Sequence, residues 1–135
     1  MELTTKERTE IAAYTNRELG AWGEDLAVQM LATKGFSILA RNWRCRYGEI
    51  DIVAFDPQDR AVIAMEVKTR RTVQSGLPEE AITVQKLQRL RILIVAWISA
   101  HREECRHLFW NELQVQVIAV DIRGDHYAIR YLREL

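Results

Sequence analysis

Acidic and basic side chains at alternate positions of two apolar stretches are the residues of this sequence best suited to chemistry. Glu49 and Asp51 lie in the first stretch, and Glu66 and Lys68 lie in the second. Alternate residues of a β-strand point to one face of a sheet, so each pair is expected to share a face. The turn-forming segment 56–60 between the stretches predicts a β-hairpin.

A hairpin that is symmetric about the middle of this turn sets Asp51 opposite Glu66 and Glu49 opposite Lys68. Directly opposed side chains have Cβ atoms about 4.5–5.5 Å apart. Two carboxylates that close repel each other unless a positive charge lies between them. Hard divalent cations such as Mg²⁺ prefer oxygen ligands, so the pattern is typical of a metal site.

In such a site Asp51, Glu66 and the backbone carbonyl of Val67 would hold the cation and leave positions for water and a phosphate oxygen. Lys68 could then orient the water or neutralise developing charge. The same residues also fit a solvated strand face, with Glu49 and Lys68 as a cross-strand ion pair that contributes under about 1 kcal/mol.

Composition predicts one soluble globular domain over residues 1–135, because 48% of the residues are hydrophobic and 28% are charged. The formal net charge is zero, so nucleic-acid binding would require a local basic patch. Cys45 and Cys105 lack metal-binding or redox spacing, which is typical of reduced thiols in a cytoplasmic protein. No stretch resembles a signal peptide, and the apolar run 92–98 is too short to span a bilayer.

A helix is predicted over residues 17–34, closed by Gly35, because apolar residues recur there at steps of three and four. Gly20 and Gly23 each weaken this helix by about 1 kcal/mol relative to alanine. Close approach of another backbone would explain both glycines and would bring Glu24 near the sheet. Glu24 is equally compatible with a solvated position at the flank of the apolar stripe.

The remaining segments predict an edge strand over 36–46, a helix from Pro78 to Ala100, and two final strands over 113–122 and 127–132. Residues 1–16 are expected to form a loose arm or a short helix. The arginines of the edge strand suit a phosphate backbone, but the pattern slightly favours protection of an open edge. The apolar second half of the later helix favours burial in the core over a dimer contact.

Asp51 followed by Glu66-x-Lys68 resembles the signature of PD-(D/E)xK nucleases. Further segments make the likeness more specific. They are Gly23-Glu24-x-x-Ala27, Gly35-Phe36, Arg41-Asn42-Trp43-Arg44, Gly48-Glu49-Ile50-Asp51-Ile52-Val53-Ala54, Glu66-Val67-Lys68-Thr69-Arg70 and Gly76-x-Pro78-x-Glu80-Ala81 with Lys86. Together they resemble the bacterial YraN family, which is similar to archaeal Holliday-junction resolvases, over about residues 17–120.

The resemblance implies an α/β fold with a restriction-endonuclease-like core, in the order αβββαβ, around a mixed sheet flanked by helices. It implies hydrolysis of phosphodiester bonds in DNA, including branched DNA, with Mg²⁺ or Mn²⁺. Glu24, Asp51 and Glu66 match the acidic positions and Lys68 the basic one. Two departures are Gln114-Val115-Gln116-Val117 where the family has Arg-Phe-Asp-Val, and Ile50 where the full motif has proline.

The resulting hypothesis is a metal-dependent endonuclease in which Asp51 and Glu66 bind the metal, Lys68 assists the attacking water and Glu24 is an auxiliary ligand. A basic set would hold the DNA: Arg41, Arg44, Arg46, Arg70, Arg71, Lys86 and Arg89. Analogy with resolvases adds a homodimer. The alternatives are a non-catalytic nucleic-acid-binding or assembly module with the same fold, and a structural protein that uses its apolar helix as a contact surface.

Overall fold

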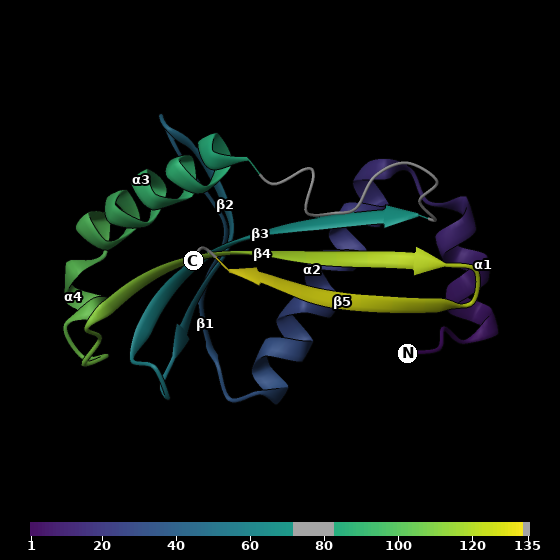
Figure 1. Ribbon diagram of the computed structural model, residues 1–135, viewed down its shortest axis with the longest axis horizontal. Helices are drawn as coiled ribbons and strands as arrows, with labels where there is room; N and C mark the ends of the chain where they lie inside the picture. The colour runs from purple at the N-terminus through teal and green to yellow at the C-terminus, as the bar shows by residue number, and fades with distance from the viewer. Residues whose placement is uncertain (72–82, 134–135) are drawn as a thin grey trace.

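Helices cover both faces of a five-stranded mixed sheet in the computed structural model, which describes residues 1–71 and 83–133 (Figure 1). The elements are α1 (Thr5–Ala13), α2 (Asn16–Thr33), β1 (Ser37–Cys45), β2 (Gly48–Asp56), β3 (Ala61–Arg71), α3 (Val84–Ala100), α4 (Arg102–Cys105), β4 (Glu112–Arg123) and β5 (His126–Arg133). The expected αβββαβ order is therefore confirmed, with α1 before it, α4 after α3 and β5 at the end.

The strands lie in chain order across the sheet, from β1 to β5. Strands β3 and β4 are parallel, whereas the other neighbours are antiparallel. Figure 1 shows the arrows of β3 and β4 pointing the same way and β5 returning beside β4. A parallel pair needs a long crossover connection, and α3 lies within the one that joins these two strands.

Two Thr-x-x-Glu sequences determine where the first helices begin. The side chain of Thr4 accepts a hydrogen bond from the N–H of Glu7, and the side chain of Thr15 accepts one from the N–H of Glu18. Each glutamate in turn accepts a hydrogen bond from the N–H of its threonine at 3.0 Å. These reciprocal bonds are capping boxes, which satisfy N–H groups that the helix leaves unpaired. The segment 1–16 thus contains a helix, one of the two forms expected for it.

The core consists of layers on the two faces of the sheet. On one face, α2 buries Ala27 and Leu31 against alternate side chains of the central strands, namely Ile52, Ala54, Ala61, Ile63, Met65, Ile118 and Val120. On the other, α3 buries Leu90, Leu93, Ile94 and Trp97 against a second set, which includes Ile50, Val53, Phe55, Val62, Ala64 and Val115. Each fully buried leucine, isoleucine, valine, phenylalanine or methionine side chain contributes about 1.5–3 kcal/mol.

The start of α3 differs from the expected one. The side chain of Thr83 accepts a hydrogen bond from the N–H of Lys86, and Thr83 itself has an extended backbone, so the helix begins at Val84. The predicted start at Pro78 lies outside the described residues. The prediction that the apolar second half of this helix is buried in the core is right for one face of α3 only. On the other face, Ile92 is 54% exposed and Val95 is 53% exposed.

Among the described residues, no helix combines the length and the apolar character needed to cross a membrane.

Candidate metal and nucleic-acid site

The β2–β3 hairpin opens where the predicted acidic residues begin. Its ladder runs from Asp56 opposite Ala61 to Ile52 opposite Met65, which confirms the register expected from the turn. The pairing ends there, one step before Asp51. Instead, Oδ2 of Asp51 accepts a hydrogen bond from the backbone N–H of Val67 at 2.8 Å. A carboxylate of β2 therefore reaches the β3 backbone at the point where the ladder ends.

β2 and β3 separate beyond Ile52 and Met65 and form a fork. At this fork, Asn42 of β1 connects two further carboxylates. Its φ of 51° lies in the left-handed region, which asparagine tolerates better than most side chains. With the amide oriented so that nitrogen faces acceptors, it donates to Oε1 of Glu24 at 3.0 Å and to Oε1 of Glu49 at 3.3 Å. One side chain from the edge strand thus connects α2 to β2.

Close packing of α2 on β3 places Glu24 beside the sheet. A Cβ atom added to Gly23 would overlap the side chain of Thr69, including its hydroxyl oxygen, whereas one added to Gly20 meets nothing within 4 Å. A close approach is therefore present at Gly23, but it is made by the Thr69 side chain and not by the expected backbone. The expectation is wrong at Gly20, where the neighbouring surface is open. Glu24 follows directly after the residue that allows the contact.

Two carboxyl groups at the fork, those of Asp51 and Glu24, have raised pKa values. Burial is the main cause of the raised pKa of Asp51, and the charges of Glu66 and Glu49 add to it. The Val67 N–H and the Lys68 ammonium act in the opposite direction. This arrangement favours a cation, because a positive charge would stabilise the ionised carboxylates.

Glu24 belongs to the same electrostatic cluster. Burial raises its pKa most, followed by the charge of Asp51, whereas Arg41 and Asn42 lower it. Carboxylates from α2 and β2 are thus coupled across the fork.

Glu66 lies between two lysines. Its Oε1 is 3.6 Å from Nζ of Lys68, and its Oε2 is 4.0 Å from Nζ of Lys86 on α3. Burial lowers the pKa of Lys86, as does the nearby Lys68, while the charge of Glu66 raises it. The cross-strand pair of Glu49 with Lys68 does not form, since the strands have separated. Glu49 instead approaches Arg44 at 3.4 Å.

A pocket of about 200 Å³ brings acidic and basic groups together. Acidic side chains of β2 and β3 and basic side chains of α3 line it, with two leucines of α3: Glu49, Asp51, Glu66, Lys86, Arg89, Leu90 and Leu93. The two predicted metal ligands thus share a pocket with two of the predicted DNA-binding residues. Glu24 is connected to this pocket through Asn42 rather than lining it.

The chemistry of these ligands fits a hard divalent cation. Among the described residues, no group of three or more histidine, cysteine and acidic side chains lies close enough to hold a metal ion. Mg²⁺ is commonly bound through only one or two carboxylates and keeps several water ligands. Asp51 and Glu66 could hold it in this way, and Glu24 would act through water or after a side-chain movement.

The other predicted DNA-binding arginines have partners of their own. Arg41 donates a hydrogen bond to Asp25 at 2.8 Å, and Arg46 donates one to the hydroxyl of Tyr47 in the exposed turn between β1 and β2. Their exposure keeps them available to a phosphate backbone.

The two arginines at the end of β3 differ from each other. Arg70 pairs with the buried Asp121 at 3.7 Å. Arg71 donates to the carbonyl oxygens of Ile11 at 3.0 Å and Tyr14 at 2.7 Å, so the structure directs it to α1 and away from the pocket.

Sequence reasoning missed the role of Asn42 and did not assign Glu49 to the site. An asparagine in the middle of a strand was the one available signal, because asparagine is depleted in strands and tolerates left-handed backbone. Its two carboxylate partners lie on other elements, which no local pattern reveals.

The order αβββαβ, the mixed sheet and the helices on both faces define an α/β protein compatible with the restriction-endonuclease-like fold. The chain belongs to the family described as uncharacterised protein family UPF0102, whose model matches residues 23–120. This is the YraN family that the sequence resembles.

Relatives named UPF0102 protein match most of the chain. The identity is 46% over 112 residues with one from Mycobacterium sp. (strain KMS), which covers 83% of this chain and 79% of the relative. It is 42% over 120 residues with one from Rhodococcus opacus (strain B4), covering 88% and 96%. It is 53% over 89 residues with one from Acidothermus cellulolyticus, covering 66% of each.

Proposed function

We propose that this protein is a metal-dependent nuclease that hydrolyses phosphodiester bonds in DNA. One observation carries the proposal: the partly buried carboxylate of Asp51 lies at the strand fork, with a pKa raised by burial and by Glu66 and Glu49. Repulsion between carboxylates destabilises a fold in which these side chains have only a structural role. In a site that binds Mg²⁺ or Mn²⁺, the cation stabilises each ionised carboxylate and removes the repulsion.

Asp51 and Glu66 would hold the metal, which supplies Lewis-acid activation of water and of the phosphodiester. The Val67 N–H fixes the carboxylate of Asp51, so its orientation is set before substrate binds. Lys68 is half-exposed beside Glu66, where its ammonium can orient water and stabilise negative charge. Glu24, hydrogen-bonded through Asn42, is an auxiliary acidic group.

The helix α3 supports binding of the substrate backbone. Lys86 and Arg89 add positive charge to the pocket that contains the acidic pair. Such groups position phosphates without reading sequence. The net charge of the chain is zero, so this local charge must carry the attraction, and binding should weaken steeply with salt. The assignment to branched DNA rests on the likeness to Holliday-junction resolvases.

A non-catalytic nucleic-acid-binding module is the second candidate, and one contact favours it. Glu66 already lies near the ammonium groups of Lys68 and Lys86, so two cations offset its charge without a metal. A protein that keeps this arrangement when it binds DNA would not need Mg²⁺.

Metal-dependent stabilisation separates the two candidates. The nuclease proposal expects Mn²⁺ to raise the melting temperature of the wild type, with this shift lost in Asp51→Asn and Glu66→Gln and retained in the control Asp125→Asn. DNA cleavage in Mn²⁺ by the wild type, and its loss in Asp51→Asn, completes the test. Equal shifts in all variants would refute the metal site, and salt-sensitive DNA binding without a shift would favour the module.

A further inference from the structure

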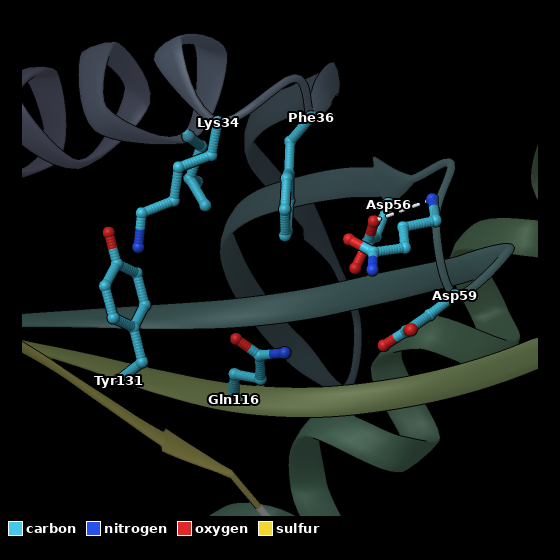
Figure 2. Close-up of a pocket in the computed structure, with 8 residues that line it drawn as sticks. Lys34, Phe36, Asp56, Asp59, Gln116 and Tyr131 are labelled. Carbon is cyan, nitrogen blue, oxygen red and sulfur yellow. Dashed lines mark hydrogen bonds between the residues drawn. The ribbon is translucent and has the colours of Figure 1, made fainter.

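A second pocket, of about 380 Å³, lies on the α2 side of the sheet. Its size is within the range of about 300–1,000 Å³ that is common for small-molecule sites. Figure 2 shows the side chains around it: Lys34, Phe36, Asp56, Asp59, Gln116 and Tyr131. The residues come from the end of α2, the β2–β3 turn and the last two strands, so the folded sheet brings them together.

One end of this pocket is acidic. Asp56 is only 7% exposed, and its Oδ1 accepts a hydrogen bond from the N–H of Gln58 at 3.0 Å. No cation within the described residues forms an ion pair with it. Asp59 adds a second carboxylate from the adjoining turn. Ionised carboxylates only accept hydrogen bonds, and a buried one needs donors. An occupant should therefore present N–H groups to this end.

The middle of the pocket is aromatic and polar. The ring of Phe36 projects between the acidic end and Tyr131 (Figure 2). Opposite it, Gln116 is 2% exposed and donates through Nε2 to Oε1 of Gln114 at 3.1 Å. The hydroxyl of Tyr131 is buried and has no hydrogen-bond partner among the described residues. A flat ring with polar edges would stack on Phe36 and meet these groups.

The other end of the pocket is basic. Nζ of Lys34 lies 3.9 Å from the centroid of the Tyr131 ring. A lysine or arginine side chain of a peptide could satisfy the acidic end, but the rest of a cationic peptide would meet this ammonium group. An occupant that carries a negative charge at the end away from its N–H donors matches both ends.

We propose that this pocket binds a nucleobase that carries an exocyclic amino group, with the attached phosphate directed toward Lys34. Cytosine, adenine and guanine each have such an amino group, whereas thymine has none, and two carbonyl oxygens flank its single ring N–H. The nucleotide can come from a free monomer or from an unpaired residue of a strand. This inference goes beyond the nuclease proposal, since it uses none of the residues at the fork.

The test is calorimetric titration of the full chain with dCMP, dAMP and dTMP in EDTA. We expect dCMP and dAMP to bind about 10-fold or more tightly than dTMP. The reason is that dTMP lacks the amino group that donates a hydrogen bond to the charged carboxylate. Asp56→Asn should lose this preference. It keeps an oxygen for the Gln58 N–H, so the fold is retained. Asp125→Asn should behave like the wild type. Equal binding of dTMP, an unchanged preference in Asp56→Asn, or no binding of any mononucleotide would overturn the inference.

Two further arms separate the sources of the base and the two proposals. Tighter binding of the oligonucleotide (dC)₆ than of dCMP indicates a strand site, and the reverse indicates a monomer site. Asp51→Asn should lose cleavage and keep its dCMP affinity. Absence of cleavage in the wild type, or cleavage retained by Asp51→Asn, with intact dCMP binding would refute only the nuclease. Backbone amide shifts should map dCMP to Phe36 and Gln116, and a map centred on Glu66 would contradict the second site.

Discussion

The Oδ2 atom of Asp51 accepts a hydrogen bond from the backbone N–H of Val67 at 2.8 Å, at the point where the β2–β3 ladder has ended. The side chain takes the place of the missing ladder hydrogen bond. Without it, the partly buried N–H of Val67 would have no partner on this side of the strand. The same bond directs the carboxylate of Asp51 toward β3 and so toward Glu66. Separation of the strands and placement of the acidic pair are therefore one structural feature.

Replacing Asp51 with asparagine should stabilise the metal-free protein at neutral pH. The pKa of Asp51 in the fold is raised above its ordinary value of 3.8, so the folded state binds the proton more tightly than the unfolded state. Stability from this group is present below pH 3.8 and is lost as the pH rises through the folded-state pKa. The asparagine variant avoids this loss, and denaturant unfolding at several pH values measures the difference.

The gap between Asp51→Asn and the wild type should close as the pH falls below 3.8. Asp125→Asn is a control with the opposite sign, because the hydrogen bond from His126 lowers the pKa of Asp125, so this variant should be less stable than the wild type at neutral pH. A variant that is less stable than the wild type at pH 7 would show that the ionised carboxylate stabilises the apo fold, contrary to the account.

Gly23→Ala should destabilise the protein by about 1–3 kcal/mol, because the new Cβ would overlap the Thr69 side chain and force α2 away from β3. Gly20→Ala is the matched control on the same helix. It meets open space, and its better helix propensity should add about 1 kcal/mol. Thermal or urea unfolding of both variants measures the contrast, and similar shifts in the two would contradict the proposed close packing.

Asn42→Gly and Asn42→Ala separate the backbone role of this residue from its side-chain role. Both remove the amide that lowers the pKa of Glu24, so carboxyl NMR titration should show that pKa higher in each. Only alanine is disfavoured at a φ of 51°, and it should be about 1–2 kcal/mol less stable than glycine. Equal stability of the two variants would exclude the left-handed backbone.

Asp121→Asn should cost about 3–5 kcal/mol of unfolding free energy, because it removes a buried charge that faces two arginines. Asp121 is 3% exposed and lies 3.7 Å from Nε of Arg70 and 3.4 Å from Nη2 of Arg130. Combining it with Arg70→Leu should recover part of the loss in a double-mutant cycle. Additive effects of the two substitutions would show that the pair is not coupled.

Local patterns predicted the parts of the fold that local physics decides. The turn at 56–60 set the hairpin register, and the apolar spacing of 17–34 set the α2 face. The start of α3 was missed because Thr83 caps a helix that begins at Val84, whereas the sequence favoured Pro78 as the first helical residue. The exposure of Ile92 and Val95 was missed because the apolar run covers more of the helix than the sheet can bury.

The candidate site was predictable only in part. Strand alternation placed Asp51, Glu66 and Lys68 together, since they share one hairpin. The fork itself depends on where pairing stops, and the link through Asn42 depends on α2 and β1 meeting in space. Arg71 was assigned to the DNA-binding set, but strand alternation places it on the face of the sheet opposite to Glu66 and Lys68. There it donates hydrogen bonds to the backbone carbonyls of Ile11 and Tyr14.

The most direct test is Mn²⁺-dependent cleavage of labelled single-stranded, duplex, flap and four-way-junction DNA by the wild type and Asp51→Asn. Both proteins are first matched for folding by circular dichroism and for salt-sensitive binding to the same DNAs. A metal-dependent nuclease should show cleavage by the wild type with Mn²⁺, none in EDTA and none by Asp51→Asn. Equal cleavage by both proteins, or tight binding by the wild type without cleavage of any substrate, would contradict the proposed function.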